Sequence, residues 1–180
     1  MSSFEDLLYA FTEWLRTTPL VELSLSISEH PVSLLIQTNF WAIPTLQTLH
    51  ILAIAAAFGA VLMLNFRVLG LAGGSRTMEQ TVRRYVPWIW WALAALIVTG
   101  IGMVVGEPVR ELINPIFWIK MGMIVIAIAL SLWFFGAVRR NMTRWEAGRA
   151  RGGVRAGAAV LILLWCTIMV AGRWIAYAPV

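Results

Sequence analysis

The sequence predicts an all-α integral membrane protein, a four-helix bundle with amphipathic helices before its first span. Of the 180 residues, 60% are hydrophobic and only 13% are charged, a balance outside the usual range of soluble domains. Many of the hydrophobic residues fall in four long runs, and an α-helix needs about 20 apolar residues to cross a bilayer core of roughly 30 Å. The runs show no two-residue alternation, and backbone groups in lipid must be hydrogen-bonded within a helix or a closed barrel. We therefore expect four transmembrane helices.

Residues 1–40 are expected to form amphipathic helices at the outer interface of the membrane. One helical stripe near the N-terminus is apolar: Phe4, Leu7, Leu8, Phe11 and Leu15. Such a helix can lie in the interface plane or pack on the outer end of the bundle, and both arrangements stay open. The acidic residues Glu5, Asp6 and Glu13 argue against a cleavable signal peptide, which begins with a basic region. Residues 28–40 predict a second short helix with Pro31 at its first position.

The four spans are expected at residues 41–64, 88–105, 117–138 and 157–174, within one membrane domain of residues 41–176. Ten of the fourteen basic residues follow the first and third spans: Arg67, Arg76, Arg83, Arg84, Arg139, Arg140, Arg144, Arg149, Arg151 and Arg155. Loops rich in Lys and Arg stay on the cytoplasmic side, so both termini are expected outside. Anionic lipid accounts for the basic excess, and no nucleic-acid partner is expected.

Little in the sequence suggests the chemistry of a soluble enzyme. Cys166 is the single cysteine and falls in the fourth span, so no internal disulfide is expected. The C-x-x-C-H motif of covalent heme attachment is missing, and so are Walker, Rossmann and zinc-protease motifs. No nucleophile–base pair or carboxylate dyad stands out, and whether the protein is an enzyme stays open.

His50 is the foremost candidate for a functional residue because it is an ionisable ring inside the first span. It lies about 10 residues from the outer end of that span, roughly 15 Å deep at 1.5 Å per residue. Ala53 and Ala57 follow on its helix face, and small residues allow close helix packing or leave room for a flat ligand. Three roles stay open: a hydrogen bond to a neighbouring helix, ligation of a heme or metal, and a proton relay.

A heme b or a copper ion suits the donors in the outer half of the predicted bundle. Met103 and Met169 are candidate second ligands beside His50, since heme iron accepts imidazole and thioether ligands. His30 is the only other histidine and could ligate from another segment or from a neighbouring subunit. Copper binds the same histidine and methionine donors.

Charged residues near the outer ends of the spans predict an ion network: Glu107, Arg110, Glu111, Lys120 and Arg173. Charges within a membrane cost about 2.5–3.5 kcal/mol each on insertion scales, so they normally face partners or water. Snorkelling and structural salt bridges at helix ends would explain the same residues. Alternatively, Lys120 and Arg173 could pair with the propionate groups of a heme. Arg67, at the inner end of the first span, is a further candidate for an ion pair.

Three stretches carry a resemblance to known proteins: HILAI with RVLG at residues 50–70, GEPVRELINP at 106–115, and GRWIAY at 172–177. They are similar to a family of small bacterial four-span membrane proteins of unknown function, over about residues 40–178. The resemblance implies that five residues belong to the family pattern: His50, Glu107, Arg110, Lys120 and Arg173. The pattern usually has Asp where this chain has Asn65, so an inner-side ion pair with Arg67 would lack its negative charge.

The plan of four spans with a histidine in the first is also similar to membrane b-type heme proteins and copper-resistance membrane proteins. We therefore expect a heme b- or copper-binding electron-transfer protein of the bacterial inner membrane, with His50 as a ligand. Its redox partner would be a quinone or a periplasmic protein.

Two alternatives belong to other classes of protein. One is a proton or ion transporter whose wet path is lined by His50, Glu107 and Arg173. The other is a structural membrane subunit without a cofactor. Rows of small residues, such as Ala53 with Ala57 and Gly102 with Gly106, favour a homo-oligomer in each case.

Overall fold

The structure is a computed structural model that describes residues 3–71, 75, 77–140 and 152–177. Its elements are, in chain order, α1 (Ser3–Arg16), α2 (Leu20–Ser28), α3 (Pro31–Thr38), α4 (Ala42–Leu69), α5 (Met78–Gly106), α6 (Pro108–Leu112), α7 (Pro115–Arg140), α9 (Gly152–Trp174) and the 3₁₀-helix η1 (Ile175–Tyr177). No strand occurs in these ranges, which confirms the all-α class. Arg76, Arg144, Arg149 and Arg151 lie outside the described residues, as do the side chains of Arg139 and Arg140.

Four helices are long and apolar enough to cross a membrane: α4, α5, residues 115–134 of α7, and α9 with η1. The protein is therefore a multi-pass membrane protein with the four predicted spans. The helices α4 and α5 extend beyond their apolar runs. The Thr77 side chain accepts a bond from the Gln80 amide at 3.2 Å, and the Gln80 side chain accepts one from the Thr77 amide at 3.1 Å. This capping box starts α5 well before the apolar run, and Gly70 ends α4 with a φ of 75°.

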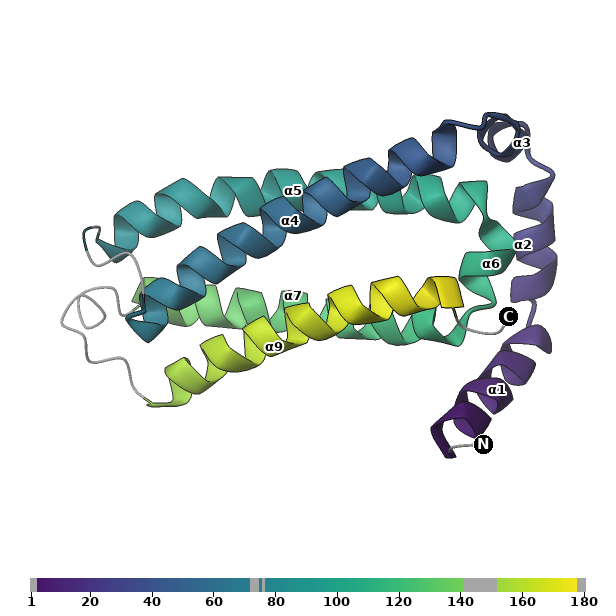
Figure 1. The fold of residues 1–180 in the computed structure, drawn as a ribbon. Coiled ribbons are helices and arrows are strands. Elements are labelled where there is room, and N and C mark those ends of the chain that lie inside the picture. The colour runs from purple at the N-terminus through teal and green to yellow at the C-terminus, as the bar shows by residue number, and fades with distance from the viewer. Residues whose placement is uncertain (1–2, 72–74, 76, 141–151, 178–180) are drawn as a thin grey trace.

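The spans form two antiparallel pairs, α4 with α5 and α7 with α9, and the contact of α4 with α9 is the main one between the pairs (Figure 1). Two apolar clusters fill the core where the pairs meet. One contains Val68, Met78, Phe134 and Ala158. The other contains Ala60, Val61, Leu64, Ile89 and Leu161. In Figure 1, α4 and α9 lie closest near the links that follow α4 and α7, and they diverge toward α6. We call these two ends of the bundle the basic end and the α6 end.

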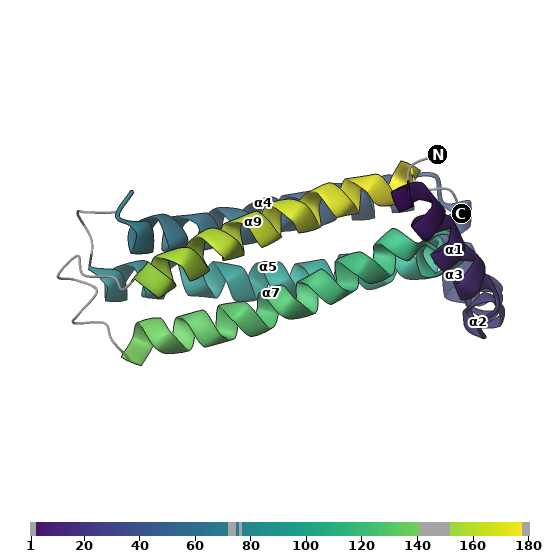
Figure 2. The same cartoon turned by 90° about the horizontal axis from the view of Figure 1, so that it is seen from below.

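The three N-terminal helices gather at the α6 end (Figures 1 and 2). The helix α3 begins at Pro31, as predicted, with His30 as its N-cap. The Ser33 hydroxyl donates to the Val105 carbonyl at 2.6 Å. This bond ties α3 to the last turn of α5, where helix carbonyls have no partner within their own helix.

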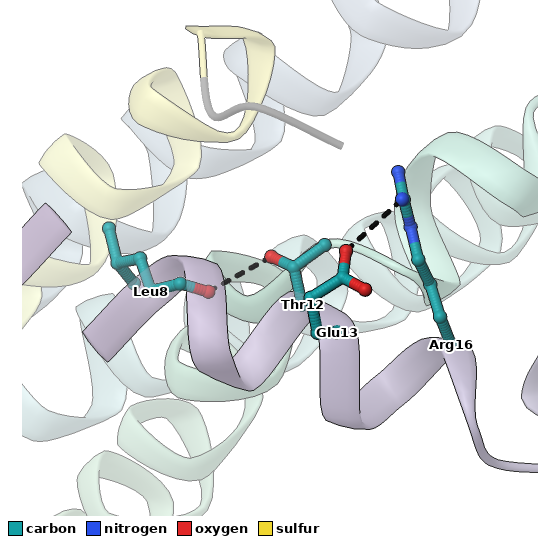
Figure 3. Close-up of polar contacts among 4 residues, drawn as sticks. All are labelled: Leu8, Thr12, Glu13 and Arg16. Carbon is teal, nitrogen blue, oxygen red and sulfur yellow. Dashed lines mark hydrogen bonds and ion pairs between the residues drawn. The ribbon is translucent and has the colours of Figure 1, made fainter. Parts of the chain in front are cut away.

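The helix α1 is amphipathic, as predicted. Thr12 and Leu15 are buried, while most of its large apolar side chains are exposed. Figure 3 shows that its polar groups are satisfied locally: the Thr12 hydroxyl donates to the Leu8 carbonyl at 3.0 Å, and Arg16 pairs with Glu13 at 3.2 Å. The helix contacts α7 and α2. It therefore packs on the end of the bundle and still presents an apolar face to its surroundings.

Candidate functional site

His50 lies half-buried on α4, with its ring turned toward α5. Its Nδ1 is 2.7 Å from the Thr99 hydroxyl oxygen, and that hydroxyl is 2.7 Å from the Ala95 carbonyl of its own helix. A hydroxyl has one proton to donate, and a carbonyl can only accept. When the Thr99 proton goes to Ala95, the Thr99 oxygen accepts from His50 Nδ1–H. In that arrangement the neutral ring carries its free lone pair on Nε2.

The close approach of α4 and α5 at this level depends on two glycines of α5. A methyl group on Gly102 would lie 3.0 Å from Leu46, and one on Gly106 would lie 2.5 Å from Ile43. A methyl group on Gly100 would only reach ordinary contact with Cε1 of His50, at 3.6 Å. Ala53 and Ala57, which follow His50 on its face, are buried. In the sequence, the rows of Ala53 with Ala57 and of Gly102 with Gly106 favoured a homo-oligomer. In the structure, these small residues pack within the chain.

Lys120 and Arg173 bring positive charge to the α6 end from the other helix pair. The aliphatic chain of Lys120 passes Gly172 of α9, where a methyl group would lie 3.9 Å from its Cδ. Its Nζ lies 5.5 Å from the centre of the Phe117 ring. Arg173 is exposed and donates to the Tyr177 hydroxyl at 2.9 Å. Within the part of the chain that the structure describes, neither residue makes an ion pair within 4.0 Å.

The predicted ion network is present in part. Arg110 pairs with Glu107 and lies 3.6 Å from Glu111, so these three residues form one cluster. Burial in α6 raises the pKa of the Glu111 carboxyl, and the positive charges of Lys120 and Arg110 partly offset that rise. Lys120 thus belongs to the electrostatic surroundings of the carboxylate cluster.

Asn114, which carries no predicted role, is fully buried and holds the α6 end together. Its amide donates to the Ile175 carbonyl at 3.0 Å, and its Oδ1 accepts from the Ile116 amide at 3.0 Å. It therefore caps α7 and joins that helix to η1. The Trp118 indole donates to the Leu112 carbonyl at 2.9 Å. The GEPVRELINP stretch is thus a rigid connection that positions Lys120, five residues beyond it.

The remaining candidates are not gathered around His50 to the same degree. His30 is an exposed N-cap whose Nδ1 accepts from the Val32 amide at 3.3 Å. Met103 is half-buried one turn beyond Thr99 on α5, and Met169 is half-buried one turn before Arg173 on α9. The described residues contain no group of three or more His, Cys, Asp or Glu side chains that could hold a metal ion.

Arg67 lies apart from the ion network. It is near the end of α4 that is farthest from Glu107, seventeen residues after His50 or about 25 Å along the helix. The structure therefore places it at the basic end, away from the other charged candidates.

The fold and the site define the class as a small four-span α-helical membrane protein with a polar cluster at one end of its bundle. The chain belongs to the family of unknown function DUF6644, whose model matches residues 38–178. The resemblance found in the sequence is confirmed at that level. None of the curated proteins and none of the solved structures matches the chain.

Proposed function

We propose that the protein binds heme b through His50 and transfers electrons within the bacterial inner membrane. The observation that carries the proposal is the contact of His50 Nδ1 with the Thr99 hydroxyl at 2.7 Å. In this proposal Nδ1–H is the donor in the contact, which makes Nε2 the basic nitrogen. Histidines that ligate metals almost always donate their other N–H in this way.

Heme is favoured over copper because of the small number of protein donors. A bare metal ion needs three or four side chains. No such group of His, Cys, Asp and Glu occurs in the described residues, so a copper ion would need methionines beside His50. A porphyrin brings four nitrogen ligands of its own, so His50 and one further protein donor would be enough to hold it. Met103 on α5 and Met169 on α9 are the candidates for that donor.

The positive charges at the α6 end suit the acidic edge of such a cofactor. Lys120 and Arg173 make no ion pair within 4.0 Å in the described ranges, and carboxylates pair strongly with such cations. We assign the two residues to the propionates. Bound heme would supply reversible one-electron chemistry, while the chain orients the ring, holds its charges and keeps water from its apolar face. A quinone or a periplasmic protein would be the redox partner.

The absorption spectrum of the purified protein tests this proposal. Wild-type protein in detergent, reconstituted with hemin and reduced with dithionite, is expected to show a Soret band and sharp α and β bands. His50→Ala is expected to abolish or shift these bands. His30→Ala, which alters the exposed histidine at the N-cap of α3, is the matched control and should keep them. A folded wild-type protein that binds no heme would overturn the proposal, whether or not it binds copper.

A proton relay is the second candidate, because Glu107, Arg110 and Glu111 form a cluster of ionisable groups at the α6 end. Its path would have to pass the layer of Ala57, Val61 and Leu64, each at most 2% exposed. Proteoliposomes with an internal pH dye would show a proton flux that is lost in His50→Ala if the relay operates. Absence of flux together with heme binding would favour the electron-transfer proposal.

A further inference from the structure

Two buried polar atoms in the core have no hydrogen-bond partner among the described residues: Oδ1 of Asn65 and Nε1 of Trp165. Asn65 is 1% exposed, and its amide nitrogen donates to the Val61 carbonyl at 2.8 Å. This bond fixes the orientation of the amide, because the oxygen could not take the place of the nitrogen beside a carbonyl. The core therefore holds one acceptor without a donor and one donor without an acceptor.

Asn65 lies four residues before Leu69 and Trp165 lies ten residues after Arg155, so in the register of α4 and α9 their backbones are offset by about 9 Å along the helices, a gap that their side chains have to shorten. Arg155 of α9 donates to the Leu69 carbonyl of α4 at 2.9 Å, which aligns the antiparallel helices at the basic end. Trp165 lies ten residues farther along α9, and helical side chains lean back toward the N-terminus of their helix. Its ring packs against the cluster of Ala60, Val61, Leu64, Ile89 and Leu161. Asn65 is the residue after Leu64 in the sequence, and its amide bonds to the carbonyl of Val61, which also belongs to that cluster.

We propose that one buried water molecule bridges Asn65 and Trp165 and so joins α4 to α9. Water donates and accepts, so it can donate to Oδ1 while it accepts from the indole N–H. A guest that only accepts, such as a quinone carbonyl, would leave Oδ1 unpaired. Buried waters in proteins typically make two to four hydrogen bonds to polar groups that would otherwise be unsatisfied. Because α4 and α9 form the main contact between the helix pairs, the bridge holds the two pairs together.

This water site is independent of the proposed heme site. Fifteen residues of α4 separate Asn65 from His50, about 22 Å along the helix. The side chains between them on α4 are apolar. The test of a bound water at Asn65 therefore does not depend on whether the protein binds a cofactor.

Nuclear magnetic resonance of the indole N–H groups tests the proposal directly. The wild-type protein, labelled with ¹⁵N-tryptophan in detergent micelles, has ten indole signals to resolve, and the one absent in Trp165→Phe belongs to Trp165. We expect that signal to show a cross-peak to water although it is shielded from exchange, and to move upfield in Asn65→Leu. A Trp165 signal without a water cross-peak would overturn the proposal, and so would a direct bond to Asn65.

A double-mutant cycle gives a second test that uses stability alone. Asn65→Leu and Trp165→Phe should each lower the melting temperature, and the double variant should melt higher than the sum of the two shifts predicts. Trp133→Phe, at an exposed position of α7, is the control for replacing an indole by a phenyl ring. Additive shifts, or single variants that melt above the wild type, would contradict a bridge.

Discussion

The hydroxyl of Thr99 holds the imidazole ring of His50 in place, because it is the hydrogen-bond partner of Nδ1. In Thr99→Val the methyl group preserves the volume of the side chain but leaves Nδ1–H unpaired in the core, at a cost of about 1–3 kcal/mol. If His50 ligates heme, the affinity of the Thr99→Val variant for heme is expected to be about 10–100-fold lower than that of the wild type, as for other changes to the hydrogen-bond partners of ligating histidines.

Hemin titration followed by absorbance, together with thermal melting, measures both effects of Thr99→Val. The matched control is Thr167→Val, since the Thr167 hydroxyl bonds only to a carbonyl of its own helix at 2.9 Å and lies exposed on α9. An equal loss of heme affinity and of melting temperature in the two variants would contradict a specific role for Thr99.

The carboxyl of Glu111 should make stability depend on pH. Burial raises its pKa above the ordinary value of 4.5, so the folded protein holds this proton more tightly than the unfolded chain. The stabilising contribution of the neutral carboxyl is then complete below pH 4.5 and is lost as the pH rises through the folded pKa. Glu111→Gln keeps a neutral group at all pH values. The melting temperature of this variant, relative to wild type, should therefore increase from pH 4.5 to about pH 8.

Glu79→Gln, at an exposed position in the first turn of α5, is the control for the Glu111 experiment. It measures how far the loss of one exposed carboxyl changes the melting temperature over the same range. A constant difference for Glu111→Gln would show that burial does not govern this carboxyl.

Sequence reasoning identified His50 and the cluster of Glu107, Arg110 and Glu111, because ionisable residues within or beside apolar runs are conspicuous. It did not identify Thr99, since a threonine in a span can satisfy its hydroxyl on its own helix and gives no separate signal. Its role depends on the register of α4 against α5, which the contacts of Gly102 and Gly106 set. That register is a property of tertiary packing.

At the scale of elements, the four spans, α1 and α3 were predictable, and α2 and α6 were not. The four spans and the helix at Pro31 follow from apolar length and from proline placement. The helices α2 and α6, with nine and five residues, are too short to show a periodic pattern. The rows of small residues on α4 and α5 were visible, but a sequence cannot tell whether such a face packs against its own chain or another.

The end of α4 offers a test of a single backbone conformation. Gly70 has a φ of 75°, and the left-handed region costs other residues roughly 1–2 kcal/mol. Gly70→Ala is therefore expected to lower the free energy of unfolding by about that amount. Gly59→Ala is the control, because a methyl group there meets no atom within 4 Å, and alanine favours the helix interior by about 0.5–1 kcal/mol. Thermal melting of the two variants checks the left-handed conformation of Gly70. A Gly70→Ala variant that melts at the wild-type temperature would contradict it.

At the scale of the whole molecule, the distribution of charge predicts the orientation of the bundle in the membrane. Arg67, Arg83, Arg84 and Arg155 lie at the basic end, beside the links that follow α4 and α7. Positively charged segments near span ends remain in the cytoplasm. We therefore expect the α6 end, with α1, α2 and α3, to face the periplasm. On that side His50 would be reached from the outer leaflet.

Labelling of single cysteines with a membrane-impermeant maleimide measures this orientation. The background is Cys166→Ser, which removes the single native cysteine. Val109→Cys in α6 and Ser75→Cys at the basic end are matched probes, since both positions are exposed. In intact cells whose outer membrane admits the reagent, Val109→Cys should react and Ser75→Cys should react only after lysis. The reverse pattern would place His50 near the cytoplasmic leaflet, and an electron partner would then have to approach from the cytoplasmic side.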